Sequence, residues 1–229
     1  RYQLVMQASR SQSAAWQPAP EHPGLRTDAL DIWQLDLLTL PCSPSLFDKD
    51  ETTRLQAFRH SDARRQFCVS RTGLRNILGK YLAIPPEQVT LRIAEGGKPR
   101  LEATPPPLYF NLSHAGSLAL LAIREDCDIG IDIEHPRPIP GMERIARRMF
   151  SDREIAGLES KNWPQDLFFR TWSHMEARQK CLGRVVFGEV AGADIVQTEG
   201  FSLGRDYYAA VAWQRGHAPA SINYYLAAP

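Results

Sequence analysis

The segment DIGIDIEH, residues 128–135, alternates isoleucine with acidic residues in its second half. Such alternation predicts a β-strand, in which successive side chains point to opposite faces. We therefore expect Ile131 and Ile133 to face a hydrophobic core, while Asp132 and Glu134 share the other face. On its own this acidic pair fits an edge strand with a solvated face. The alternative is a divalent cation such as Mg²⁺, which takes oxygen ligands from a few carboxylates and from a substrate's phosphates.

The composition of the chain is that of an ordinary globular protein, since 43% of its 229 residues are hydrophobic and 23% are charged. The formal net charge is only +1, so it does not favour nucleic acid as a partner, and an anionic ligand has to meet a local basic cluster. No apolar run approaches the roughly 18 residues of a membrane span, and the first residues lack the apolar core of a signal peptide. We expect a cytoplasmic protein without a membrane segment.

Four cysteines lie far apart in the sequence and form no CxxC pair: Cys42, Cys68, Cys127 and Cys181. This spacing gives no sign of a structural zinc site. In a cytosolic protein such cysteines are expected to be reduced thiols.

Hydrophobic periodicity and capping residues predict a mixture of helices and strands. The clearest helix covers residues 61–83, whose apolar positions at helical spacing are Phe67, Leu74, Ile77, Leu78 and Tyr81. Further helices are predicted over residues 43–58, 142–150, 151–160 and 164–183. Strands are predicted over residues 31–40, 89–95, 128–134, 193–201, 206–214 and 222–227, and on both sides of a turn at SHAG, residues 113–116. Residues 11–30 are predicted to form a surface arm, and residues 96–107 a loop.

The order of these elements is similar in the two parts of the chain. A strand, a long helix and a hairpin precede residue 125, and a strand, helices and further strands follow it. We find no repeat in the residues themselves. The layout predicts an α+β fold with two similar halves, residues 1–125 and 126–229, and a cleft between them.

A third carboxylate is found in TWSHMEARQK, residues 171–180. Glu176 and Lys180 are four residues apart on a predicted helix, so they lie on one face. They could join a cation and phosphate site with the acids of the strand. The alternative is a simple salt bridge within the helix, with Trp172 as a core residue.

The dipeptide Ser113-His114 in NLSHAG is another candidate. The two residues could simply form a turn after the strand, or they could present a hydroxyl and an imidazole to phosphate. A hydrolase triad is not indicated, because the chain has no GxSxG elbow and no third partner. The segment GGKP, residues 96–99, is not a P-loop, because GxxxxGK[ST] is absent.

Taken together, these motifs resemble those of one enzyme family. The segments GKP (97–99), FNLSHAG (110–116), GIDIE (130–134) and WSxxEAxxK (172–180) resemble, in order and spacing, the Sfp-type 4'-phosphopantetheinyl transferases. The segment FSDREIAGL lies between the last two. The resemblance implies transfer of the phosphopantetheine arm of coenzyme A to a serine of an apo acyl or peptidyl carrier protein. It also implies release of adenosine 3',5'-bisphosphate, a need for Mg²⁺ (with Mn²⁺ as an alternative), and a monomeric pseudo-dimer with coenzyme A in the cleft.

The resemblance assigns the acidic residues to a metal and to catalysis. It implies that Asp132, Glu134 and Glu176 hold one Mg²⁺ together with the pyrophosphate of coenzyme A. Lys180 would contact the phosphates as a point charge. Glu176 is the candidate general base for the carrier serine, and Asp132 is the other candidate.

The resemblance assigns further residues to coenzyme A itself. Ser113 and His114 match contacts to its phosphates, and Lys98 with Pro99 matches the GKP contact near the adenine nucleotide. Arg54 lies where the family often has a basic residue that reaches the 3'-phosphate. Arg64 and Arg71 lie on the long helix, either as further phosphate contacts or as part of a solvated face.

One position departs from the family pattern. Many members carry Lys directly before the metal-binding Glu, and this chain has Met175 there. A methionine cannot contact phosphate, so one alternative is a catalytically impaired homologue that binds coenzyme A or a carrier. A second alternative is another Mg²⁺-dependent phosphoryl-transfer enzyme, such as a nuclease. Since the three acids and Lys180 are present, we expect an active transferase, with only a mild change in turnover for Met175→Lys. The sequence does not indicate which carrier protein is the partner.

Overall fold

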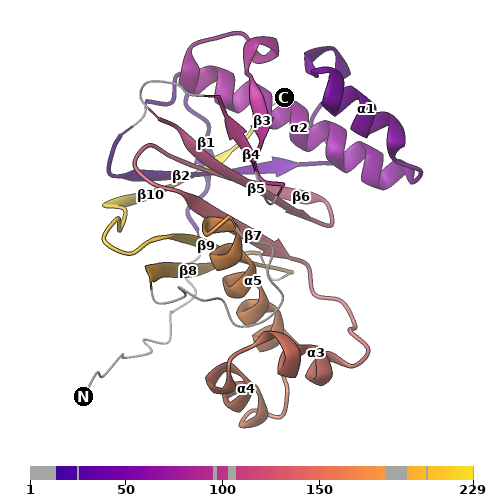
Figure 1. Cartoon of the computed structure of the whole chain (residues 1–229), viewed down its shortest axis with the longest axis vertical. Helices are drawn as coiled ribbons and strands as arrows, with labels where there is room; N and C mark the ends of the chain where they lie inside the picture. Colours follow the sequence, from indigo (N-terminus) through magenta and orange to yellow (C-terminus); the bar gives the residue numbers. More distant parts are fainter. Residues whose placement is uncertain are drawn as a thin grey trace.

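The computed structural model describes residues 14–24, 26–94, 97–102, 107–183, 195–204 and 206–228. It combines helices with β-sheets, so the predicted α+β class is confirmed (Figure 1). The helices are α1 (Lys49–Ala57), α2 (Ser61–Leu82), α3 (Met142–Met149), α4 (Asp152–Glu159) and α5 (Gln165–Cys181), with 3-10 turns at Pro44–Leu46 and Pro86–Gln88. The strands are β1 (Gln17–Pro18), β2 (Ala29–Asp36), β3 (Leu91–Ile93), β4 (Pro99–Leu101), β5 (Tyr109–Ala115), β6 (Leu118–Arg124), β7 (Ile129–Glu134), β8 (Val196–Leu203), β9 (Tyr207–Gln214) and β10 (Ser221–Leu226).

Two equivalent units make up the fold. In the first, β2 is followed by α2 and the β5–β6 hairpin, and the strands lie in the order β2-β6-β5. In the second, β7 is followed by α5 and the β8–β9 hairpin, in the order β7-β9-β8. Neighbouring strands of both units are antiparallel. The predicted repetition of a strand, a helix and a hairpin is thus present, and Figure 1 shows α2 and α5 on opposite sides of the two sheets.

The core between the two sheets explains the alternation in GIDIE. Ile131 and Ile133 are fully buried in one cluster with Leu30 and Ile32 of the first sheet. The opposite face of β7, which carries Asp132 and Glu134, is turned toward α5. The predicted division of this strand into an apolar and an acidic face is therefore confirmed.

The long helix α2 covers the outer face of the first sheet. Its predicted apolar stripe is buried, and all but Phe67 of that stripe lie in the same core cluster as Trp33 and Leu35 of β2. The helix ends at Ala83, which has a left-handed backbone conformation with φ of 53° and donates its N–H to the carbonyl of Gly79. This ending agrees with the Pro residues that follow.

The chain returns to the first sheet at its C-terminal end. Strand β10 lies between β1 and β2 and runs parallel to both. Asn223 of β10 donates to Asp31 Oδ1 of β2 (2.7 Å), and Tyr81 of α2 donates to Asp31 Oδ2 (2.5 Å). Residues 17–18 are exposed at the surface, as predicted, and pair with β10. The prediction of a surface arm is wrong for Ala29 and Leu30, which are buried in β2, and residues 11–13 lie outside the described part. The division of the chain at residue 125 stays a prediction.

A disulfide corrects the prediction for two of the cysteines. Cys42 and Cys68 are bonded, with 5.3 Å between their Cα atoms. Cys42 follows β2 and Cys68 lies in α2, and the intervening segment is held against α2 by a hydrogen bond from Ser43 N to Thr72 Oγ1 (3.0 Å). The pair is 26 residues apart, so only the packing of the loop on α2 reveals it. Cys127 and Cys181 are free and buried, as expected of reduced thiols.

Two predicted loops also differ from the structure. Ser113 and His114 lie within β5, and the tight turn of the hairpin falls at Gly116 and Ser117 instead. Part of the predicted loop at residues 96–107 forms β4, which pairs with β3, whereas residues 95–96 and 103–106 lie outside the described part. None of the described helices is both long enough and apolar enough to cross a membrane.

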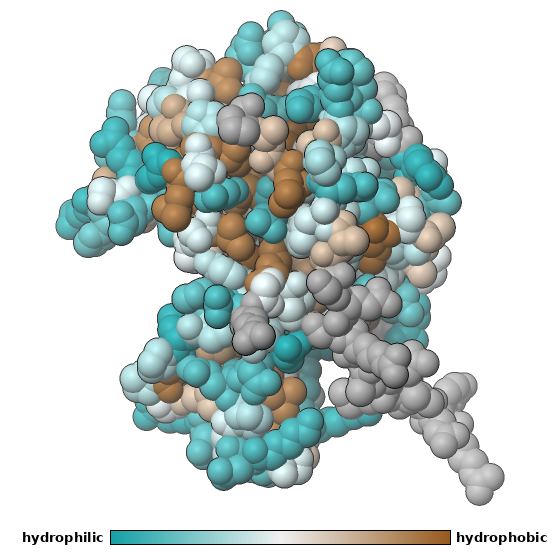
Figure 2. All heavy atoms as spheres, turned by 180° about the vertical axis from the view of Figure 1, so that it is seen from behind, coloured by the Kyte–Doolittle hydropathy of each residue, from teal (hydrophilic) through white to brown (hydrophobic). Residues whose placement is uncertain are grey.

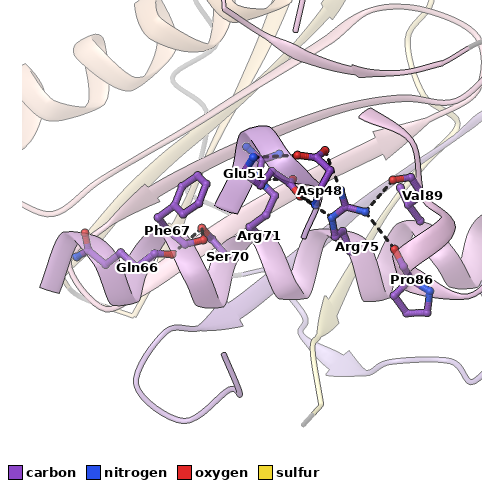
Figure 3. A network of polar contacts seen from close by, with 9 residues as sticks. All are labelled: Asp48, Glu51, Gln66, Phe67, Ser70, Arg71, Arg75, Pro86 and Val89. Atoms are coloured by element: carbon purple, nitrogen blue, oxygen red, sulfur yellow. Dashed lines mark hydrogen bonds and ion pairs between the residues drawn. The ribbon is translucent and has the colours of Figure 1, made fainter. Parts of the chain in front are cut away.

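A buried ionic network joins α1 to α2 (Figure 3). The guanidinium of Arg75 is almost fully buried and pairs with Glu51 Oε2 (2.6 Å) and Asp48 Oδ2 (3.2 Å). It also donates to the carbonyls of Val89 (2.8 Å) and Pro86 (3.3 Å). Arg71 pairs with the other oxygen of Glu51 (3.2 Å). Charges taken out of water need such partners, and here two cations meet two carboxylates.

Candidate active site

A cleft of about 610 Å³ lies where the two halves meet. The first half contributes residues of α2 and of the β5 end of the hairpin, and the second half contributes the end of β7, the segment after it and α5. The lining residues are Gln66, Leu112, Ser113, His114, Ala115, Gly116, Asp132, Ile133, Glu134, His135, Arg137 and Lys180. Four of the predicted site residues, Ser113, His114, Asp132 and Glu134, are therefore brought together with Lys180 in one cleft.

Gly130 allows α5 to approach β7 closely enough to complete this site. A Cβ atom on Gly130 would lie 2.0 Å from the carbonyl oxygen of Ala177 and 2.5 Å from the amide nitrogen of Cys181. Neither backbone atom could give way, so a side chain there would push the helix outward. The small residue between Ile129 and Ile131 thus sets the distance between the strand with Asp132 and the helix with Lys180.

Asp132 lies at the centre of a contact between the two halves. Lys180 Nζ donates to Asp132 Oδ1 (2.6 Å) and to Ser113 Oγ (3.0 Å). Ser113 Oγ in turn donates to Asp132 Oδ1 (3.0 Å). Burial raises the pKa of the Asp132 carboxyl, and the nearby Lys180 ammonium opposes this shift. The ion pair of Lys180 is therefore with Asp132 of the neighbouring strand, and not with Glu176 of its own helix.

The oxygen atoms of the site suit a divalent cation. Asp132 Oδ2 is buried and has no hydrogen-bond partner among the described residues. The pKa values of Glu134 and Glu176 are raised, mainly by burial and also by repulsion from the Asp132 carboxylate. A buried unpaired oxygen, on a carboxylate that repels two further carboxylates, is an unfavourable arrangement that a hard cation would relieve. These residues thus fit a site for a divalent metal ion.

The carboxylates have to approach one another to share an ion. In the described part of the chain, the atoms of one group alone, Asp126, Cys127 and His217, are potential ligands within 4.8 Å of each other. The Asp126 carboxylate of that group is already paired with the Arg124 guanidinium, so we assign no metal to the group. Glu176 would have to turn its side chain toward Asp132.

The hairpin turn beside the cleft is held from both halves of the molecule. Gln66 of α2 donates to the carbonyl of Gly116 (2.8 Å), and the amide of Ser117 donates to the hydroxyl of Tyr207 in β9 (3.3 Å). Gly116 has a positive φ of 55°, and a Cβ there would lie 2.7 Å from that hydroxyl. His114 precedes this turn, and its pKa is lowered, first by burial and then by the Lys180 ammonium. The imidazole faces the cleft, and these two effects favour its neutral form.

The basic residues predicted on α1 and α2 lie elsewhere. Arg71 is buried in the network with Glu51, and its guanidinium packs on the ring of Phe67. Arg54 packs on the same ring with its centre 5.3 Å from the centroid, and Arg64 lies on the exposed face of α2. None of the three lines the cleft, and a role for them in coenzyme A binding stays a prediction.

Lys98 and Pro99 also lie outside the lining of this cleft. Pro99 begins β4. The Lys98 ammonium is nearly buried and donates to Asp128 Oδ1 (3.2 Å), to the carbonyl of Ile129 (2.7 Å) and to the carbonyl of Lys180 (3.1 Å). Lys98 thus contacts the backbone beside the site, and its contact with the adenine nucleotide stays a prediction.

Met175 faces away from the cleft. Its side chain is 4% exposed and packs in a cluster with Met149, Phe150 and Phe168, between α5 and the α3–α4 pair. Seen from behind, the α3–α4 end has a mainly hydrophilic surface over this apolar interior (Figure 2). The argument for an impaired enzyme assumed a side chain that reaches the phosphates, and the buried position removes that argument.

Two residues that line the cleft, Arg137 and Gln66, were missed in the sequence, as was the buried Asn111. Arg137 pairs with Glu134 (3.2 Å), Asn111 Oδ1 accepts from the amide of Ile131 (2.8 Å), and Gln66 holds the hairpin turn. Asn111 lies within FNLSHAG, so the motif itself pointed to it. Arg137 lies in the Pro-rich segment HPRPIPG, residues 135–141, between a predicted strand and a predicted helix, and Gln66 is one polar residue among many on α2, so neither gave a signal.

A second, apolar hollow of about 320 Å³ adjoins the cleft at Glu134 and Arg137. Its walls are formed by Ile139, Ile145, Phe168, Phe169 and Trp172, with Pro138 and Pro140. The polar cleft and this apolar hollow thus share Glu134 and Arg137 as lining residues.

Comparison with known proteins agrees with this geometry. Residues 128–224 match the model of the 4'-phosphopantetheinyl transferase superfamily, and residues 33–126 match the model of the 4'-phosphopantetheinyl transferase N-terminal region. The chain is 36% identical over 176 residues to the 4'-phosphopantetheinyl transferase HetI of Nostoc sp., covering 73% of this chain and 74% of that protein. This chain belongs to the 4'-phosphopantetheinyl transferase family.

Two further relatives of this 4'-phosphopantetheinyl transferase come from Bacillus subtilis and from human. A 4'-phosphopantetheinyl transferase of Bacillus subtilis is 28% identical over 180 residues, which cover 77% of this chain and 75% of that protein. The human L-aminoadipate-semialdehyde dehydrogenase-phosphopantetheinyl transferase is 30% identical over 146 residues, which cover 58% of this chain and 47% of that protein. The chain is thus an enzyme that transfers phosphopantetheine from coenzyme A to carrier proteins.

Proposed function

We propose that Asp132, Glu134 and Glu176 of this transferase hold one Mg²⁺, or Mn²⁺ in its place, together with the pyrophosphate of coenzyme A. The observation that carries the proposal is the buried Oδ2 of Asp132, which has no hydrogen-bond partner among the described residues, on a carboxylate that raises the pKa values of Glu134 and Glu176. The ion would offset charge on the phosphoryl oxygens during the displacement.

The protein's own groups would bind and orient the substrate. Lys180 supplies a point charge at the phosphates, and Ser113 with His114 faces them from the first half. The apolar hollow beside Glu134 suits the largely aliphatic pantetheine arm, which has to lie next to the reacting phosphate. Charged and apolar parts of coenzyme A thus have separate walls to bind.

Glu176 is the stronger candidate for the general base. Asp132 Oδ1 is already bonded to Lys180 and Ser113, whereas the side-chain carboxylate of Glu176 forms no hydrogen bond or salt bridge with other described residues. The raised pKa of Glu176 brings it closer to the operating pH, which favours proton transfer. Its carboxylate would take the proton of the carrier serine while the serine oxygen bonds to phosphorus and adenosine 3',5'-bisphosphate leaves.

A single chain provides groups from both halves, so we propose a monomer that acts on an apo acyl or peptidyl carrier protein in the cytoplasm. The test is mass spectrometry of apo carriers incubated with the enzyme, coenzyme A and Mg²⁺, with one fatty-acid carrier and one peptide carrier. We expect a gain equal to the mass of the phosphopantetheine arm that disappears with EDTA. An equal gain in the presence of EDTA would contradict the metal assignment, and light scattering that gave a dimer would contradict the monomer.

A further inference from the structure

Lys98 occupies an unusual place for a residue expected to meet a nucleotide. It precedes β4 in the first half, yet its side chain is only 8% exposed and reaches into the second half. Its ammonium lies between the start of β7 and the C-terminal end of α5, where it bonds to Asp128, Ile129 and Lys180.

The bonds of this ammonium leave no donor for a ligand. A lysine ammonium carries three N–H groups and accepts no hydrogen bond. Lys98 has three acceptors, namely Asp128 Oδ1 (3.2 Å), Ile129 O (2.7 Å) and Lys180 O (3.1 Å). A nucleotide could be contacted only if one of these bonds broke.

Two of these acceptors belong to the elements that carry the reacting groups. The last carbonyls of a helix have no partner within the helix, and a cation near them is favourable. Lys180 O lies in this last turn of α5, where it also accepts from the amide of Gly183 (3.3 Å), and Ile129 O belongs to the strand that carries Asp132. One ammonium thus ties the end of α5 to the start of β7.

The Lys180 side chain depends on this connection. Its Nζ lies 2.6 Å from Asp132 Oδ1, and a shift or fraying of the last turn of α5 would displace it. Misplacement of a positioned charge by about 1 Å can cost on the order of a hundredfold in rate. A bond to the backbone of Lys180 itself is the most direct way to prevent such a shift.

We propose that Lys98 is a positioning residue that fixes the C-terminal end of α5 on β7 and thereby sets Lys180 against Asp132. The inference rests on the proposed role of Lys180 and Asp132. It gives Lys98 a role in turnover, in place of the contact to the adenine nucleotide that the family resemblance implied.

The kinetic test compares Lys98→Met with Arg100→Met in the full chain. Arg100 is a matched control because it pairs with the same Asp128 (2.9 Å) and, unlike Lys98, is not bonded to the Lys180 carbonyl among the described residues. For arm transfer to an apo carrier, we expect Lys98→Met to lower kcat by about tenfold or more, with the KM for coenzyme A nearly unchanged. Arg100→Met should resemble the wild type. A raised KM with unchanged kcat for Lys98→Met would overturn the proposal.

A double-mutant cycle asks whether Lys98 acts through Lys180. In a Lys180→Met background, we expect Lys98→Met to have little further effect on kcat, because the group that it positions is gone. If the fold-losses in kcat of the two single variants multiply in the double variant, the two residues act independently and the proposal is overturned.

A third measurement does not depend on activity. Amide hydrogen exchange at Cys181 and Leu182, in the last turn of α5, should be faster in Lys98→Met than in Arg100→Met. Equal exchange in the two variants would overturn the inference, even if the wild-type enzyme is active. If the wild type is inactive but exchange is still faster in Lys98→Met, only the proposed function is overturned. If Lys98→Met does not fold, Lys98→Gln, which keeps two donors, takes its place in all three measurements.

Discussion

Lys180 donates to Asp132 across 2.6 Å and not to Glu176, which lies one turn away on its own helix. The contact forms only when α5 packs on β7, because Lys180 comes from the helix and Asp132 from the strand. It also leaves Glu176 without an ion pair in the described chain and available for a metal or a proton. A salt bridge within α5 would have occupied both groups.

The buried network of α1 and α2 gives a prediction on stability. Arg75→Ala removes a cation that holds Glu51 and Asp48 and leaves the buried carboxylate of Glu51 with less compensation. Loss of one partner of such a pair costs about 3–5 kcal/mol, so we expect a free energy of unfolding lower by that amount in urea denaturation. Arg64→Ala, on the exposed face of the same helix, should change it by less than about 0.5 kcal/mol. Equal effects of the two variants would contradict the role of the network.

Met175 gives a prediction that separates stability from turnover. Met175→Lys places an amine in the apolar cluster with Phe168 and Met149, so we expect thermal unfolding at a clearly lower temperature, with a loss of about 2 kcal/mol or more. Ala156→Lys, at an exposed position of α4, is the matched control. The kcat of the folded Met175→Lys enzyme should change less than tenfold, since the side chain does not reach the cleft. A larger gain in kcat would mean that residue 175 does reach the phosphates.

The Cys42–Cys68 bond should stabilise the first half. It closes a loop of 26 residues, and a loop of this length corresponds to about 3.5 kcal/mol in the chain-entropy model. We expect reduction to lower the denaturation midpoint of the wild type to that of a Cys42→Ser, Cys68→Ser double variant. The same reductant should leave the double variant unchanged. A wild type that responds no more than the variant would show that the thiols are not bonded in solution.

His174 makes the stability of α5 dependent on pH. Its Nδ1 contacts Thr198 Oγ1 at 2.8 Å, and burial lowers its pKa from 6.5 to about 4, with Arg178 and Arg170 acting in the same direction and Glu154 against it. Between these pH values the unfolded chain binds a proton that the folded chain does not bind. Stability should therefore fall as the pH drops from 6.5 to 4, by at most about 3 kcal/mol from this residue.

The variant His174→Gln isolates this effect of pH. The difference in unfolding free energy between wild type and variant should shrink as the pH falls through this window and stay constant below it. A difference that does not vary with pH would show that the imidazole is already solvated in the folded enzyme.

Local patterns predicted the parts of the fold that depend on nearby residues. The alternation in GIDIE predicted both faces of β7, and the spacing of Leu74, Leu78 and Tyr81 predicted the buried side of α2. Glu176 and Lys180 were placed on one helix face by their spacing alone. These features follow from the periods of strand and helix.

Features that depend on contacts between distant segments could not be predicted. The position of β10 in the first sheet, the pairing of Cys42 with Cys68 and the burial of Met175 all arise from how separate elements pack. The same holds for Lys98, because its acceptors lie about 30 and 82 residues away in the sequence. A motif identifies such a residue as important without indicating which atoms it contacts.

The central claim is that Asp132 organises the metal and phosphate site of this transferase. The most direct measurement is the initial rate of arm transfer to an apo carrier by Asp132→Ala, followed by mass spectrometry, with Glu143→Ala on the exposed face of α3 as the control. Loss of preorganised charge at the reacting phosphate predicts a rate at least ~100-fold below wild type, and an unchanged rate for the control. An Asp132→Ala enzyme that folds and retains most of its activity would contradict the account.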